Sequence, residues 1–143
     1  MTKFAFENRI WDRAETQERS ELDAVQLTRL RECLRRASRV AFYREAFQGC
    51  GITPESVKTL NDVRRLPLTT KEDLRRYYPL GFLAEARENL ARIHGSSGTT
   101  GKPTFVAYTR DDVDLWANLC ARFLVAGGLR PEHLVHIAFG YGL

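Results

Sequence analysis

Apolar side chains recur at helical spacing through the first third of the chain. Over residues 17–48 they return every three to five positions, which is the period of an amphipathic α-helix. Gly49 and Gly51 follow and supply stop signals. The pattern therefore predicts one long helix over about 17–48. Its recurring apolar positions are Leu22, Val25, Leu30, Leu34, Ala37, Ala41 and Phe47.

Two short helices are indicated by the residues that would begin them. Thr53 precedes Pro54, which suits an N-cap followed by the first helical position. Thr70 is followed by acids at positions 72 and 73, which would meet the positive end of the helix dipole. We expect this second helix to end near Pro79.

The pattern changes near residue 90. Residues 90–94 are predicted to form a strand, and residues 104–109 a second one that is rich in β-branched and aromatic side chains. Thr109 is the expected N-cap of a third main helix, and Gly127-Gly128 its end. Residues 133–139 are predicted to form a last strand. The buried stripe of the third main helix is expected to be Val113, Trp116, Leu119, Cys120, Phe123 and Ala126.

These elements place the chain in the α/β class, with helices and strands mixed. The expected order is N-terminal helices, then strand–phosphate loop–strand, helix and strand. About 1–80 is the helical segment, and about 90–143 is the start of an α/β sheet. A length of 143 residues suits one domain or one piece of a larger one. An apolar share of 43% with 28% charged residues excludes a disordered chain.

The net charge and its distribution bear on whether the chain binds nucleic acid or another polyanion. The net charge of +4 is small for a dedicated nucleic-acid binder, so no nucleic-acid partner is expected. Arg31, Arg35 and Arg39 share one face of the first helix at i, i+4 and i+8. The first interpretation of this face is a solvated surface, and the second is a site for a polyanion.

Cysteine usage and hydropathy indicate a compartment. Three widely spaced cysteines without Cys-x-x-Cys, behind an N-terminus that meets charge too soon for a signal peptide, indicate reduced thiols and a cytoplasmic protein. No window approaches the roughly 18 uninterrupted apolar residues of a membrane span, so no membrane partner is expected. His133 and His136 would point to opposite faces of a strand, so no metal site is predicted.

The nine residues from Gly95 to Pro103 carry the clearest chemistry. Glycines let backbone N–H groups turn inward, and successive inward N–H groups bind anions. Four hydroxyls add donors and Lys102 adds a positive charge, a combination that suits a phosphate. A Walker A loop would need glycine where Ser96 stands and a hydroxyl where Pro103 stands, so a Walker-type NTPase is disfavoured. A plain Gly/Ser turn in a hairpin is the remaining alternative.

Residues 96–104 (SSGTTGKPT) resemble the phosphate-binding signature of the adenylate-forming enzymes, the acyl-CoA and aryl-CoA synthetases. In its common form a lysine follows the proline, whereas here Thr104 stands there and Lys102 precedes it. That arrangement is similar to the phenylacetate–CoA ligase branch. Residues 66–75 (LPLTTKEDLR) resemble the L-P-x-T-x-K-x-D-L-R element of that branch, and residues 39–44 (RVAFYR) its V-P-F-Y segment. Residues 139–143 look like the start of its substrate loop, so the resemblance covers about residues 25–143.

The resemblance implies an AMP-forming aryl-acid–CoA ligase that uses ATP, Mg²⁺ and coenzyme A. It makes an acyl-adenylate with release of pyrophosphate, and then a thioester. Tyr141, with room left by Gly142, would line the aryl pocket, although packing at a strand end is the alternative for Tyr141. The ATP phosphates would be bound by Ser96, Ser97, Gly98, Thr99, Thr100, Gly101 and Lys102.

In this family the catalytic lysine and the adenine, ribose and magnesium contacts lie further along the sequence. Residues 1–143 are therefore expected to be the N-terminal portion of an AMP-binding (adenylation) domain, without a catalytic residue and inactive alone. Three alternatives stay open: a standalone nucleotide- or phosphate-binding module, a relative that adenylates another acid, and a helical interaction module built on residues 17–48. The long first helix could also pair two copies as a homodimer.

Overall fold

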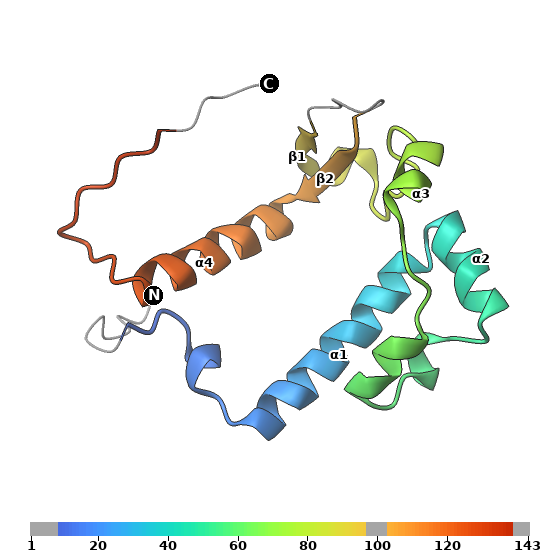
Figure 1. The fold of residues 1–143 in the computed structure, drawn as a ribbon, viewed down its shortest axis with the longest axis horizontal. Coiled ribbons are helices and arrows are strands. Elements are labelled where there is room, and N and C mark those ends of the chain that lie inside the picture. The colour runs from blue at the N-terminus through green and yellow to red at the C-terminus, as the bar shows by residue number, and fades with distance from the viewer. Residues whose placement is uncertain (1–8, 97–102, 139–143) are drawn as a thin grey trace.

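The computed structural model describes residues 9–96 and 103–138 of the chain. Figure 1 shows two long helices, α1 and α4, with α2 beside one end of α1 and a two-stranded hairpin at the start of α4. The helices and strands are α1 (Arg19–Ala37), α2 (Ala41–Gly49), α3 (Lys71–Arg76), β1 (Leu90–Gly95), β2 (Phe105–Thr109) and α4 (Arg110–Ala126). Short 3₁₀ turns are η2 (Arg13–Thr16), η3 (Pro54–Ser56), η4 (Leu60–Arg65) and η5 (Arg87–Asn89).

The single helix predicted over 17–48 is wrong, because α1 and α2 are separate helices. The Ser38 hydroxyl and amide both donate to the Leu34 carbonyl, and the next two amides bond three residues back instead of four. Val40 is extended (φ −81°, ψ 128°) and its side chain is buried. The break thus directs the Val40 side chain into the interior. It lies next to Ser38, whose hydroxyl competes for a backbone carbonyl of the helix.

The predicted end of this helical region at its glycines is confirmed. Gly51 has φ +63°, a conformation that glycine adopts without strain. This lets the amides of Gly51 and Ile52 bond back to the carbonyls of Gln48 and Phe47, the Schellman arrangement. The turn places Ile52 against Phe47 in the core.

The main core lies between α1, α2 and the segment that follows them. Leu34, Phe47, Ile52 and Val57 are buried together. Removing such side chains from water is the main source of stability for a chain of this size. Partly buried residues around them are Leu27, Leu30, Ala37, Tyr43 and Leu66.

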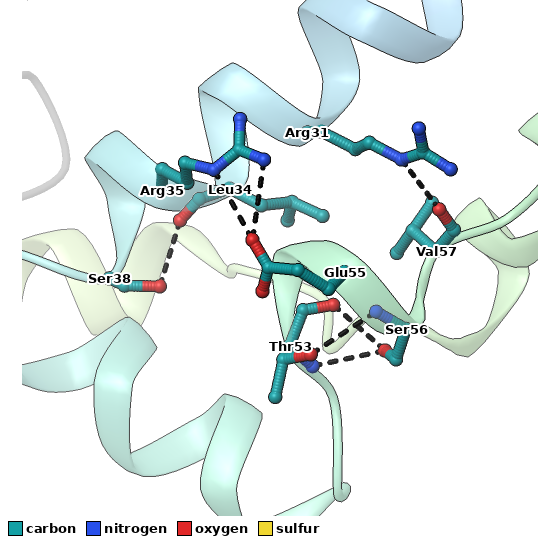
Figure 2. A network of polar contacts seen from close by, with 8 residues as sticks. All are labelled: Arg31, Leu34, Arg35, Ser38, Thr53, Glu55, Ser56 and Val57. Atoms are coloured by element: carbon teal, nitrogen blue, oxygen red, sulfur yellow. Dashed lines mark hydrogen bonds and ion pairs between the residues drawn. The ribbon is translucent and has the colours of Figure 1, made fainter.

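The arginine face, with Arg31 and Arg35 on α1 and Arg39 just beyond its end, makes polar contacts with other segments of the chain. Arg31 donates to the Val57 carbonyl at 2.8 Å, and Arg35 pairs with Glu55 at 3.2 Å (Figure 2). Arg39 pairs with Glu85 at 3.0 Å. The side chains of Arg35 and Arg39 stay exposed to solvent, as the first interpretation expected, and each guanidinium also binds a neighbouring segment of the chain.

Hydroxyl caps begin the remaining helices as predicted. Thr53 caps η3 in a reciprocal bond with Ser56, which Figure 2 shows beside the arginine face. Thr70 and Asp73 form the capping box of α3, which ends at Arg76, a little before the expected Pro79. Each box satisfies amides that the helix itself leaves without partners.

The N-terminal segment is held against α4. The Trp11 indole donates to the Asn118 amide oxygen at 2.6 Å, and the Asn118 amide donates to Asp12 at 3.1 Å. The Ala14 amide, then Asn118, lowers the pKa of the Asp12 carboxyl. Arg122 pairs with Glu15 at 3.4 Å.

Two expectations for the second half of the chain are wrong. Trp116, Leu119 and Phe123 of the predicted buried stripe are exposed, Phe123 to 62%, although the Trp116 ring also contacts His94 and Tyr108. Residues 133–138 form no strand, and Leu134 is 100% exposed. Figure 1 shows this segment running apart from the hairpin, where no strand offers it ladder hydrogen bonds.

The predicted mixture of helices and strands is confirmed, with an antiparallel sheet of two strands among the described residues. Within the same ranges, no helix has both the length and the hydropathy to span a bilayer.

We expect Leu34→Ala to lower the free energy of unfolding by about 2–4 kcal/mol, through lost burial and the cavity that remains. Leu34 is 4% exposed and touches the centre of the core, whereas Leu68 is 88% exposed. Leu68→Ala is therefore the matched control and should change stability by less than about 0.5 kcal/mol. Urea unfolding followed by circular dichroism measures both, and equal effects would contradict this core.

Candidate functional site

The chemically informative loop is held by an antiparallel hairpin. β1 and β2 pair in a register that sets His94 opposite Val106 and Gly95 opposite Phe105. An irregularity between Leu90 and Arg92 shifts the register at the far end. The two predicted strands are therefore confirmed as an antiparallel pair, and their register fixes where residues 96 and 104 lie.

One further pair of residues closes the hairpin beyond the ladder. The Ser96 amide donates to the Thr104 carbonyl at 3.0 Å, and the Thr104 amide donates to Ser96 Oγ at 2.9 Å. The two side-chain hydroxyl oxygens lie 3.2 Å apart. We call Gly95, Ser96, Thr104 and Phe105 the loop neck.

Glycine at position 95 is required by the opposite strand. A Cβ on Gly95 would lie 2.9 Å from Cε1 of the Phe105 ring, closer than real Cβ atoms come. The Phe105 ring is itself backed by Tyr78, with ring centroids 5.6 Å apart. Backbone and ring thus meet closely at the base of the loop.

β2 runs directly into α4 through a capping box. Thr109 Oγ1 accepts from the Asp112 amide at 3.2 Å, while Asp112 accepts from the Thr109 amide at 2.8 Å. The Thr109 amide and hydroxyl hold the pKa of the Asp112 carboxyl below its usual range, with a smaller contribution from Arg36. The predicted cap is confirmed, and it transmits the position of β2 to a long helix.

Contacts between aromatic rings join the hairpin to α4. His94 of β1, Tyr108 of β2 and Trp116 of α4 form a mutual group with centroid distances of 5.2 to 5.5 Å. Offset and edge contacts of this kind add to the stability that burial supplies. The face of the hairpin that carries these rings therefore rests on the helix.

A cavity of about 420 Å³ lies beside the loop neck, between α1, α2, β2 and residues 77–85. Its walls are mainly apolar and aromatic, and Phe105 belongs both to this cavity and to the loop neck. No sequence signal indicated it, because its lining comes from segments far apart in the chain. The aromatic and charged residues that line it are Tyr43, Tyr77, Phe82, Phe105, Arg36, Glu85 and Asp112.

The structure places one predicted site residue, Ser96, at the loop neck. Thr104 was not among the predicted site residues, although its position in the signature, where the common form of the adenylate-forming signature has lysine, was the available signal. In residues 9–96 and 103–138 no group of three or more His, Cys, Asp or Glu side chains could hold a metal ion. Outside the described residues lie Ser97, Gly98, Thr99, Thr100, Gly101, Lys102, Tyr141 and Gly142.

The chain is similar in sequence to curated proteins that share one name. No model of a known protein family matches the chain. It is 47% identical to phenylacetate-coenzyme A ligase of Escherichia coli (strain K12) over 92% of its own length. It is 51% identical to the Aromatoleum evansii enzyme of that name over 86%. The chain is homologous to part of the phenylacetate–CoA ligases.

The match covers most of this chain but less than a third of each of these two ligases. The chain spans 30% of the length of the Escherichia coli ligase and 28% of the Aromatoleum evansii ligase. The fold agrees with a solved relative, a 2-hydroxyisobutyryl-CoA ligase in complex with 2-HIB-AMP and CoA in the thioesterification state. That structure superposes with a TM-score of 0.80 at 32% identity, over 92% of this chain and 29% of that one.

The capping carboxylate at the start of α4 generates a prediction about pH. Its pKa is lowered by folding, so the stability it contributes is full above the unfolded pKa of about 4 and is lost as the pH falls through the lower, folded value. We expect Asp112→Asn to lose less stability than the wild type between pH 6 and pH 3. Melting temperatures across that range measure it.

Asp111→Asn is the matched control, since Asp111 is exposed in the same turn and forms no part of the capping box. Its profile should follow the wild type, and an Asp112→Asn profile parallel to the wild type would refute the role of this carboxylate.

Proposed function

We propose that this chain is the ATP-phosphate-binding part of an AMP-forming aryl-acid–CoA ligase. The identity of about half of its residues to phenylacetate–CoA ligases, over most of its length, carries the proposal. The hairpin supports it, because it brings together the two ends of a segment whose composition suits a phosphate.

In the proposed reaction a carboxylate oxygen attacks the α-phosphorus of ATP, which forms an acyl-adenylate and releases pyrophosphate. The sulfur of coenzyme A then attacks the acyl carbon, and AMP leaves. The loop from Ser96 to Lys102 would hold the β- and γ-phosphates in line with the attacking carboxylate. Its contribution is positioning, together with neutralisation of charge on the leaving pyrophosphate, for which Lys102 is the point charge.

Mg²⁺ would enter this chemistry with the nucleotide. Among the residues that the structure describes, no group of three or more His, Cys, Asp or Glu side chains could hold it. The catalytic lysine and the contacts to adenine, ribose and coenzyme A belong, in this proposal, to sequence other than residues 1–143.

Phenylacetate is the substrate we propose, because the similar ligases carry its name. The solved relative is named for a branched hydroxy acid, so a different acid is the alternative within the same chemistry. Tyr141, with space left by Gly142, would line the pocket for the ring. We also propose a cytoplasmic location, small-molecule partners in place of nucleic acid or membrane, and a homodimer through the helical segment as an open expectation.

A standalone phosphate-binding module is disfavoured by one face of the structure. Leu115, Trp116, Leu119 and Phe123 lie within a narrow arc of α4 and are all exposed; we call them the α4 stripe. Exposed apolar patches of this kind mark interaction surfaces. In a protein of the length of the related ligases, further chain would cover it.

The proposal predicts acid-dependent exchange of pyrophosphate into ATP by the full-length protein that carries this chain. We expect phenylacetate to stimulate the exchange, and Lys102→Ala to reduce kcat/KM on the order of 10- to 100-fold by removing the point charge. Lys58→Ala, which changes an exposed lysine away from the hairpin, is the control and should match the wild type. Absence of exchange with every aryl and acyl acid would refute the ligase function.

A second prediction concerns residues 1–143 alone. Expressed as a separate polypeptide, they should form no acyl-CoA thioester from ATP, phenylacetate and coenzyme A, because the groups that complete the site are not among them. The assay is thioester absorbance with mass-spectrometric detection of the product, and the full-length protein is the positive control. Robust turnover by the separate polypeptide would overturn this division of roles.

A further inference from the structure

We propose that Ser96 and Thr104 are a positioning pair that fixes the two ends of the phosphate loop. Ser96 then acts on the ATP phosphates through the loop and does not touch them. This inference rests on the proposed function and assigns within it two roles that the signature alone does not give.

The contacts of Ser96 account for this role. Its amide donates to the Thr104 carbonyl, its Oγ accepts from the Thr104 amide at 2.9 Å, and its hydroxyl meets the Thr104 hydroxyl at 3.2 Å. A serine hydroxyl has one proton and two lone pairs. One lone pair is used by the Thr104 amide, and in the proposed arrangement the proton is used by Thr104 Oγ1. No donor is then left for a phosphate oxygen, which only accepts.

The pair stands on a firm base. Gly95 precedes Ser96, Phe105 follows Thr104, and these two residues are paired across the hairpin. They lie so close that a methyl group on Gly95 would collide with the Phe105 ring. Five residues beyond Thr104, the Thr109 capping box begins α4. Fixing both ends of a binding segment restricts where its donors can lie, and such preorganisation leaves more of the binding free energy for the ligand.

The hydroxyl of Thr104 is the feature that lets this pair form, because a hydroxyl both donates and accepts hydrogen bonds. The common form of the adenylate-forming signature carries lysine there. A lysine side chain only donates hydrogen bonds, so it cannot accept the proton of the Ser96 hydroxyl. In this chain the lysine stands at position 102. The hydroxyl of Thr104 therefore bonds Ser96, and the positive charge stands two positions earlier in the sequence.

The test is a double-mutant cycle in the full-length protein, read by ATP–pyrophosphate exchange with phenylacetate. We expect Ser96→Ala to raise the KM for ATP on the order of tenfold, because small misplacement of positioning groups is costly. Thr104→Val should raise it less, since the Thr104 amide bond to Ser96 survives. The double variant should be no worse than Ser96→Ala, the non-additivity of residues that act together.

Three readouts separate positioning from a general loss of structure. The KM for phenylacetate and the melting temperature should stay near wild type, and Thr104→Ser, which keeps the hydroxyl, should restore the KM for ATP. Thr28→Val removes a threonine hydroxyl on α1 that bonds only within its helix, and it should leave all values unchanged.

Independent effects of Ser96→Ala and Thr104→Val that multiply in the double variant would show that Ser96 touches the phosphate, and would overturn the pair. Normal kinetics in Ser96→Ala would overturn it as well. Absence of exchange in the wild type would instead refute the proposed function, and this role with it.

Discussion

The antiparallel pairing of β1 with β2 is the constraint on which the candidate site depends. It places residues 95 and 105 opposite one another, so the glycine- and hydroxyl-rich segment between them has to close as a loop. Because β2 continues into α4 without a linker, the Thr109–Asp112 capping box and the rings of His94, Tyr108 and Trp116 fix the hairpin on the helix. Short local contacts therefore determine where an anion would be presented.

A second set of contacts joins α1 to the segments that follow it, and charged side chains make these contacts. Exposed ion pairs such as Arg35–Glu55 contribute little singly. The Arg31 bond to the Val57 carbonyl is different, because it satisfies a backbone acceptor beside the most buried side chain of the core. The spacing of the arginines showed which face they share, but their partners come 20 to 46 residues later in the chain.

Local signals in the sequence predicted the ends of elements well. The hydroxyl caps at Thr53, Thr70 and Thr109 and the glycine that follows α2 were all recognisable, because each depends on neighbours within a few residues. The break at Ser38–Val40 was missed because apolar spacing continues through it. The buried stripe and the last strand were wrong because both require a partner surface, which periodicity cannot supply. The loop segment itself was found by composition and resemblance, while the role of Thr104 needed its position across from Ser96.

The distribution of these contacts separates two parts of the proposed chemistry. The contacts described for the loop neck come from residues 78–112, so in the proposed function charge recognition would depend on groups that this chain contains. The α4 stripe and residues 133–138 are largely exposed to solvent, and the chain spans less than a third of the ligases it resembles. Phosphate binding needs donors and a positive charge, which a hairpin can present near its own surface, whereas selecting one acid over another needs an enclosed apolar pocket. The hairpin can therefore be shaped by its own sequence, whereas in the proposed ligase the choice of acid would depend on apolar surfaces enclosed by residues outside the hairpin.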